Sequence, residues 1–178
     1  MSFFQRFNSV EKKEPIMDKF EKDILTLIKE DSRLSAKRIA AMLGTDEKTV
    51  EDKISALESA GIIVKYTAIL NTDSLEEEAV EALIEVKVTP QQGHGFDKIA
   101  REIAEHDEVK NLYLMSGGYD LAVIVKGKSL RSVSRFVSEK ISTYENVLST
   151  ATHFILKKYK INGELTVPSE NKRQVVTP

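Results

Sequence analysis

The sequence predicts an α+β protein built from two small domains, and three observations lead to that prediction. Its 178 residues, 41% of them hydrophobic, are enough to form one large core or two small ones. Apolar residues recur at helical spacing in residues 17–60, whereas an alternation with a period of two begins at residue 79. Between them lies a polar segment with three consecutive glutamates. The predicted organisation is an N-terminal extension (1–16), a helical domain (17–70), a linker (71–78), an α/β domain (79–160) and a C-terminal tail (161–178).

Three short helices are expected in the first domain, because side chains that can cap a helix precede each apolar stripe. Asp18 stands before the first stripe, where a carboxylate favours the positive end of the helix dipole. Ser35 is expected to cap a second helix that ends at Gly44. Asp46 is expected to cap a third helix that ends at Gly61.

The second and third predicted helices, joined by a short turn, have the pattern of a DNA-binding helix-turn-helix. Residues 62–70 are rich in β-branched and aromatic side chains, and we expect them to form a wing and an exit strand. Cationic side chains there would hold phosphates, and a threonine would approach a base edge. The candidate DNA-binding residues are Lys37, Arg38, Lys48, Thr49, Lys53 and Lys65.

The alternative interpretation of this domain is a three-helix fold with ordinary solvated charges. Residues 17–70 contain nine Lys and Arg against ten Asp and Glu, a net charge of −1. The third helix itself carries four acidic residues. The charge balance therefore leaves both interpretations open.

The second domain has the predicted element order strand, helix, strand, strand, helix, strand. Strand alternation in residues 79–88 precedes a helical stripe in residues 96–103, and two apolar strands are expected at 109–115 and 121–125. A second stripe of Leu130, Val133, Val137 and Ile141 precedes a final strand at 147–157. This is the ferredoxin-like βαββαβ order, in which both helices cover one sheet face. The uncovered face is expected to be buried by self-association into a homodimer, or a higher oligomer.

The segment between the two middle strands is a candidate binding loop. Gly117 and Gly118 would let a ligand approach the backbone closely, while Tyr119 and Asp120 would add an aromatic wall and a carboxylate for an ammonium group. The alternative is a plain hairpin loop in which the glycines supply positive φ and the aspartate bonds its own turn.

Several function classes are disfavoured by composition. The chain has no cysteine, and His94, His106 and His153 show neither metal-ligand spacing nor a catalytic triad pattern. We therefore expect no catalytic residues, no metal and no cofactor. No apolar run approaches the roughly 20 residues that span a bilayer, so the expected location is the cytoplasm, without membrane contact.

The order and spacing of several short segments resemble the Lrp/AsnC family of transcription regulators over residues 18–160. The matching segments include Ile39-Ala40, Leu43-Gly44, Gly61-Ile62-Ile63, Tyr66-Thr67-Ala68, residues 114–121 and residues 147–156. The resemblance implies a winged helix-turn-helix, a ferredoxin-like regulatory domain, dimers that often assemble further, and an amino acid or related metabolite as effector.

The resemblance also implies roles for particular residues. Gly117 to Asp120 correspond to the family's effector-binding loop, and Thr150 and Thr152 match a segment that approaches the same pocket near a subunit interface. One departure concerns the third helix, where Glu51, Ser55 and Ala56 stand at positions that are often basic in the family. Fewer phosphate contacts would weaken binding to DNA.

Two alternative functions remain open at this point. One is an enzyme resembling siroheme decarboxylases, which share the scaffold and hold a tetrapyrrole. The other is a metabolite sensor that no longer binds DNA. The leading hypothesis is a sequence-specific regulator that binds double-stranded DNA and responds to a small effector.

Overall fold

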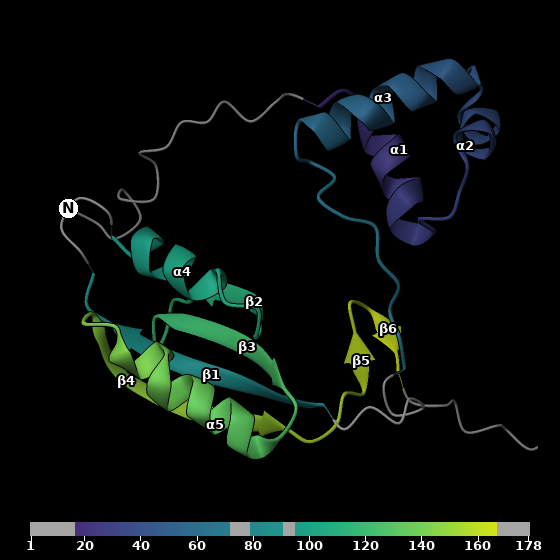
Figure 1. Ribbon diagram of the computed structural model, residues 1–178. Coiled ribbons are helices and arrows are strands. Elements are labelled where there is room, and N and C mark those ends of the chain that lie inside the picture. Colours follow the sequence, from purple (N-terminus) through teal and green to yellow (C-terminus); the bar gives the residue numbers. More distant parts are fainter. Residues whose placement is uncertain (1–16, 72–78, 91–94, 167–178) are drawn as a thin grey trace, which may run out of the picture. The chain divides into compact units, whose positions relative to one another are not determined.

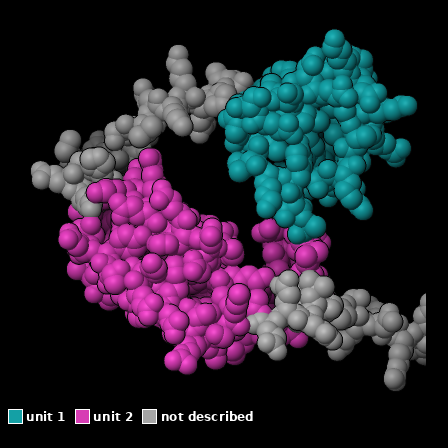
Figure 2. Space-filling view, viewed as in Figure 1, with its two compact units in different colours: residues 1–68 teal, residues 69–178 magenta. Residues whose placement is uncertain are grey.

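The computed structural model describes residues 17–71, 79–90 and 95–166. The chain divides into two compact units, residues 1–68 and 69–178 (Figures 1 and 2). The described part of the first unit contains helices and irregular chain, and the second is an antiparallel sheet with helices on it. The predicted α+β class is confirmed.

The first unit consists of three helices that begin at the predicted caps. They are α1 (Lys19–Glu30), α2 (Ala36–Leu43) and α3 (Glu47–Ser59). The side chains of Asp18, Ser35 and Asp46 each accept a hydrogen bond from a backbone N–H in the first turn. Gly44 follows α2 with a φ of 70°, a left-handed conformation that glycine adopts without strain.

A small core holds the three helices together. It consists of Ile24 on α1, Ile39 and Ala40 on α2, and Val50 on α3, with half-buried residues packed around them. Helices of 8 to 13 residues are marginal in water by themselves. The fold of this unit therefore depends on a few core side chains and on its caps.

The segment after α3 differs from the prediction. Residues 62–70 form no regular strand, and their exposed side chains include Val64, Ile69 and Leu70. A strand requires a hydrogen-bonding neighbour, and none lies beside this segment in the described residues. One contact holds its start, since the Tyr66 hydroxyl donates to Glu58 Oε1 on α3 at 2.9 Å. Burial, and then the nearby Glu58 carboxylate, raise the pKa of Tyr66.

The second unit contains the predicted ferredoxin-like topology (Figure 1). The four strands pair antiparallel in the order β2-β3-β1-β4, so each helix links two strands that are not neighbours. The elements are β1 (Val80–Val88), α4 (Asp97–Ala104), β2 (Val109–Leu114), β3 (Leu121–Gly127), α5 (Leu130–Glu139), a 3₁₀ turn (Ile141–Thr143) and β4 (Val147–Ile155).

Both helices pack on one face of this sheet. The core combines alternate residues of β1, such as Ile84, with Leu121 and Val123 on β3, Ile103 on α4 and Val133 on α5. The predicted inward stripe of the second helix needs two corrections. Leu130 is 56% exposed because it stands in the first turn, and Phe136 is buried instead. Ile141 is buried but belongs to the 3₁₀ turn.

The first residues of the predicted C-terminal tail take part in regular structure. A short hairpin forms from β5 (Lys160–Ile161) and β6 (Glu164–Leu165), and Thr166 closes it. The backbone N–H of Thr166 donates to the carbonyl of Tyr159, and its hydroxyl donates to the carbonyl of Lys158. Asn162 and Gly163 form a turn with positive φ, which this pair of residues adopts readily.

Candidate DNA-binding surface and effector site

The turn between α2 and α3 presents the third helix in the arrangement of a helix-turn-helix. The left-handed Gly44 reverses the chain, and the backbone N–H of Thr45 donates to the carbonyl of Ala40 at 3.0 Å. Asp46 then starts α3 at once. This local sequence therefore fixes two helices at the short turn that DNA-reading motifs require.

Four of the six predicted DNA-contact residues have exposed side chains. Lys37 and Arg38 lie in the first turn of α2, Lys48 lies in the first turn of α3, and Lys65 lies in the segment after α3. Three of these cations are thus at helix N-termini, where backbone N–H groups also favour an anion such as phosphate.

Thr49 makes a structural contact as well as lying at the start of α3. Its backbone N–H donates to Asp46 Oδ1 at 2.9 Å, and its hydroxyl donates to Asp46 Oδ2 at 2.6 Å. The hydroxyl bond, followed by the backbone bond, lowers the pKa of Asp46. The hydroxyl oxygen of Thr49 keeps acceptor capacity, but its proton is engaged.

Lys53 is placed differently from the other candidates. Its Nζ lies 2.9 Å from Glu21 Oε1 and 3.3 Å from Asp18 Oδ2, so it links α3 to the start of α1. The hydrogen bond to Glu21, and then that to Asp18, raise the pKa of Lys53. These partners could not be predicted from local spacing because they lie 32 and 35 residues away in the sequence.

The predicted effector loop lies at one end of the sheet in the second unit. It closes where the backbone N–H of Met115 donates to the carbonyl of Asp120 at 2.8 Å. Neither Gly117 nor Gly118 adopts a positive φ, and a Cβ added at either would meet no atom within 4 Å. The suggestion that these glycines supply positive φ is therefore wrong, and the space beside them is open.

Asp120 connects this loop to β1. Its backbone N–H donates to the carbonyl of Val86 at 3.1 Å, and its Oδ2 accepts from the backbone N–H of Val88 at 2.9 Å. Its bond thus runs to a neighbouring strand rather than to its own turn. In the described residues Oδ1 accepts no hydrogen bond, so half of the carboxylate remains open to a ligand.

The two threonines on β4 lie at the same end of the sheet as the loop. Val86 on β1 pairs with Leu121, the residue after the loop, on one side and with Thr150 on the other. Thr152 pairs with Ile84, two residues further along β1. The Oγ of Thr150 lies 3.4 Å from Ser142 Oγ, and both threonines are half-buried. The topology therefore brings the loop and Thr150 into one row of the sheet, two strands apart.

The described histidines do not form a common site. His106 packs edge-on against Phe136, and its Nε2 lies 3.0 Å from the hydroxyl of Tyr144. His153 is on the opposite sheet face, where its Nε2 lies 3.4 Å from Glu85 Oε1. His94 lies outside the described residues. In residues 17–71, 79–90 and 95–166 no group of three or more His, Asp or Glu side chains is arranged to hold a metal, and no helix is long and apolar enough to cross a membrane.

Comparison with known proteins assigns each unit to a family model. Residues 17–64 match the model of a winged helix-turn-helix DNA-binding domain, and residues 81–165 match that of the Lrp/AsnC ligand-binding domain. The second match extends into the β5–β6 hairpin, so this hairpin belongs to the domain and not to a tail.

Relatives with the same arrangement occur in bacteria and archaea. YugG of Bacillus subtilis, named as an uncharacterized HTH-type transcriptional regulator, is 44% identical over 160 residues, which are 89% of this chain and 96% of the relative. The HTH-type transcriptional regulator FL11 of Pyrococcus furiosus is 27% identical over 152 residues, 85% and 97% of the two chains.

Solved structures have the same fold. AsnC of Escherichia coli aligns with a TM-score of 0.63 at 18% identity, covering 85% of this chain and 99% of the other. A transcriptional regulator from Neisseria meningitidis, crystallised as a complex with L-Met, aligns with a TM-score of 0.63 at 22% identity, covering 82% and 93%. The two domain matches and the full-length relatives together place this chain in the Lrp/AsnC family of transcription regulators, with a DNA-binding and a ligand-binding domain.

Proposed function

We propose that this regulator binds a specific DNA sequence through the N-termini of α2 and α3, and that an α-amino acid bound at residues 117–120 changes its affinity for DNA. The observation that carries the proposal is the capped pair of helices with exposed Lys37, Arg38 and Lys48 in their first turns. Lys65 adds a cation in the following segment, where a wing would meet the backbone.

Within this surface we assign different roles to the two remaining candidates. Thr49 approaches a base edge through its free acceptor lone pair, since its proton is engaged by Asp46. Lys53 contacts phosphate only if it leaves Asp18 and Glu21, so its main role is to hold α3 against α1. With these roles, α3 would read DNA through Thr49 although it carries four acidic residues, and Lys53 would keep the helix in position.

The effector proposal rests on the geometry of the loop. The open space beside Gly117 and Gly118, the aromatic ring of Tyr119 and the open oxygen of Asp120 together suit a small ligand with an ammonium group. Thr150 and Thr152 lie on β4, two strands away from β3 at the same end of the sheet, and would complete the pocket with a second subunit. The Neisseria relative crystallised with L-Met supports an amino acid as the class of ligand.

We propose further that the protein is a homodimer that buries the sheet face opposite α4 and α5, and that dimers associate further. On this face Leu83 pairs with Ile124, while Glu85 lies between Ala122 and Ala151. Apolar and small side chains in adjacent strands favour close packing of a second copy. Amino-acid binding near such an interface would favour one assembly over another and thereby change DNA affinity by linkage.

We also propose that the protein acts in the cytoplasm, together with DNA, and has no enzymatic activity. The separation of His106 from His153 supports the second point, because a tetrapyrrole enzyme would gather its histidines around one pocket. The sensor without DNA binding remains the second candidate, because Lys53 and the Thr49 hydroxyl are both engaged within the unit.

Selection of bound genomic fragments, with and without a panel of amino acids, tests the proposal. We expect one sequence motif to be enriched, with occupancy that changes when one amino acid is added. A triple variant that replaces Lys37, Arg38 and Lys48 with alanine should lose the enrichment, while a matched variant in Lys98, Arg101 and Lys110 of the second unit should keep it. Equal recovery of all fragments would support the DNA-free sensor instead.

A further inference from the structure

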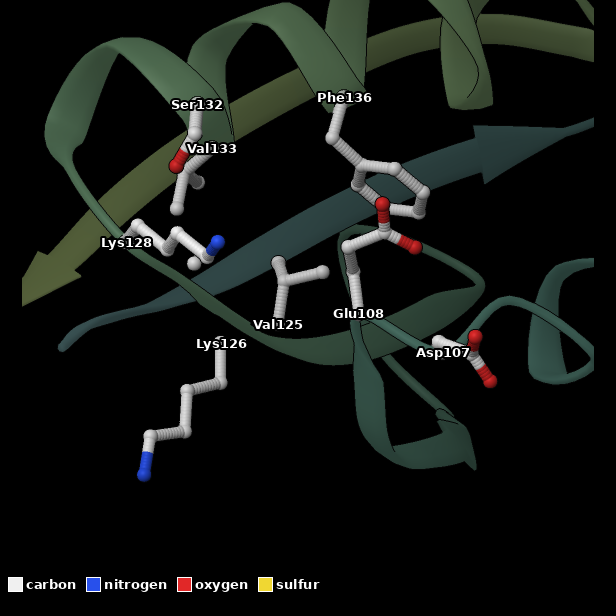
Figure 3. Close-up of a pocket in the computed structure, with 9 residues that line it drawn as sticks. Asp107, Glu108, Val125, Lys126, Lys128, Ser132, Val133 and Phe136 are labelled. Carbon is white, nitrogen blue, oxygen red and sulfur yellow. The ribbon is translucent and has the colours of Figure 1, made fainter.

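A hollow lies in the C-terminal unit, at the opposite end of the β2–β3 hairpin from the loop at residues 117–120. Its volume is about 360 Å³, within the range of roughly 300–1,000 Å³ that is typical of small-molecule sites (Figure 3). It opens where β2 begins, β3 ends and α5 begins. Because β2 and β3 are antiparallel, the start of one strand lies beside the end of the other, remote from the loop.

The floor of the hollow is apolar. Val125 on β3 and Val133 and Phe136 on α5 line it, and all three are also part of the buried core. Val125 and Val133 are almost completely buried and Phe136 is 6% exposed, so the gain of about 25 cal/mol for each Å² would come mainly from the apolar surface that the ligand itself removes from water.

One wall of the hollow is fixed by close packing. A Cβ on Gly127 would lie 2.7 Å from Ser132 Oγ and 2.8 Å from Val133 Cγ2, so only glycine fits there. The end of β3 and the first turn of α5 are therefore closely packed against each other.

Two opposite charges face the floor. Figure 3 shows the Lys128 ammonium turned toward Val125 and the Glu108 carboxylate extending toward the Phe136 ring, whereas Lys126 and Asp107 extend away from both. In the described part of the chain, neither Lys128 nor Glu108 takes part in an ion pair. Their side chains are exposed, so both are available to a ligand that enters the hollow.

We propose that this hollow binds an α-amino acid with an aliphatic side chain. The ligand's carboxylate meets Lys128, beside the first turn of α5, where the helix dipole also favours negative charge. Its ammonium group meets Glu108, and its side chain lies against Phe136, the most exposed residue of the apolar floor. The site is complete within one chain and stands independently of the effector loop.

Equilibrium dialysis of the full chain with labelled leucine and methionine tests this site. We expect Lys128→Gln and Glu108→Gln each to raise the dissociation constant of the amino acid bound in the hollow at least about tenfold. Each substitution removes a charge-assisted hydrogen bond to that ligand. The matched controls Lys140→Gln and Glu145→Gln remove the same charges outside the hollow and should bind as the parent chain does. Thermal unfolding of every variant checks that the fold is kept.

Two ligand analogues separate the contributions of the two charges. 4-Methyl-2-oxopentanoate lacks the ammonium group of leucine, and isopentylamine lacks its carboxylate. We expect each analogue to compete at least about tenfold more weakly than leucine. Equal competition by either analogue would overturn the pairing proposed for the missing group.

The variant Asp120→Asn separates this site from the effector loop, and its amide can still accept from Val88. We expect Asp120→Asn to bind one equivalent of amino acid per chain. The double variant that also carries Lys128→Gln should lose this binding.

If Asp120→Asn abolished all amino-acid binding while Lys128→Gln and Glu108→Gln left binding unchanged, the hollow would be excluded and the proposed effector loop supported. Retained binding in the hollow with no effect of any amino acid on DNA affinity would leave this inference standing and contradict the proposed regulation. No binding of leucine or methionine by the parent chain would overturn the inference.

Discussion

The two units of this regulator are stabilised in different ways. The N-terminal unit has a core cluster of four buried residues, with caps at the start of each short helix. The C-terminal unit has a core of thirteen buried residues drawn from β1, β3, α4, α5 and the 3₁₀ turn, with partly buried residues of β2 and β4 packed against it. The DNA-binding half therefore depends on a small core and on its helix caps, whereas the ligand-binding half depends on a much larger core.

Truncating one core residue in each unit tests this difference most strongly. Ile39→Ala and Ile84→Ala remove the same atoms from fully buried positions, at a cost of about 2–5 kcal/mol each. We expect Ile39→Ala to unfold the smaller unit and abolish DNA binding while the second unit keeps its thermal transition. Calorimetry of both variants measures this. Equal effects of the two substitutions on DNA binding would show that the units unfold together.

Acid should also act first on the N-terminal unit. Hydrogen bonds from the backbone of Glu21, from the Arg33 side chain and from the Thr49 hydroxyl lower the pKa values of Asp18, Asp31 and Asp46 respectively. An aspartate whose pKa is lower in the folded unit than in the unfolded chain stabilises the fold above the unfolded pKa of about 3.9. This stabilisation is lost as the pH falls through the pKa of the folded state.

Hydrogen exchange of each unit between pH 6 and pH 3 measures this sensitivity. The helices of the N-terminal unit should lose protection in the acid range before β1 and β3 do. As a control, Asp46→Asn and Asp31→Asn together should reduce the dependence on pH. Simultaneous loss of protection in both units would contradict this expectation.

Lys48 and Lys53 lie on the same helix but should affect DNA binding differently. Lys48→Ala should lower the slope of log K against log salt by about 0.9, because one phosphate contact is lost. Lys53→Met should leave the slope unchanged and lower the stability of the N-terminal unit, because it separates α3 from Asp18 and Glu21. DNA titrations over a range of salt concentrations, with thermal unfolding, measure both effects.

The raised pKa of Lys53 adds a second test of its role. Its contribution to stability is complete below the unfolded value of about 10.4 and is lost as the pH rises through the folded value. The loss of stability of the N-terminal unit as the pH rises through this range should be absent in Lys53→Met. A reduced salt slope for Lys53→Met would instead make this lysine a phosphate contact.

Removing one cap should have the smallest effect. Ser35→Ala removes the side chain that accepts from the backbone N–H of Arg38 at 3.2 Å, and we expect a cost of about 1 kcal/mol. Ser129→Ala, the corresponding change at α5, should lower the free energy of unfolding by a similar amount. This should be a smaller fraction of the total stability of the C-terminal unit, because its core is larger. Thermal unfolding of both variants measures this, and we expect the larger fall in melting temperature in the N-terminal unit of Ser35→Ala.

The features that could be predicted from the sequence are those set by near neighbours. Each cap contacts a backbone group three residues away, and the alternation in β1 places Ile84 and Val86 in the core at every second position. The element order then restricts the sheet to very few topologies, which is why the βαββαβ fold could be predicted.

The features that were missed depend on contacts between distant segments. Lys53 meets Asp18 and Glu21 on another helix, and no spacing rule connects them. The hollow beside Lys128 is lined by residues that precede β2, by the end of β3 and by α5, which come together only in the folded unit. The expected strand at residues 62–70 failed for a related reason, since β-branched composition indicates extended chain but does not supply a pairing partner.

The central claim is that an acidic helix-turn-helix with few available cations still reads DNA, under control of an amino acid bound to the other unit. The most direct test is a titration of the assembled protein with a selected operator at several salt concentrations, with and without that amino acid. We predict that log K falls linearly with log salt, with a slope that reflects about three or four phosphate contacts, and that the amino acid shifts K by at least about fivefold. Absence of binding at low salt, or a K that no amino acid changes, would contradict the account.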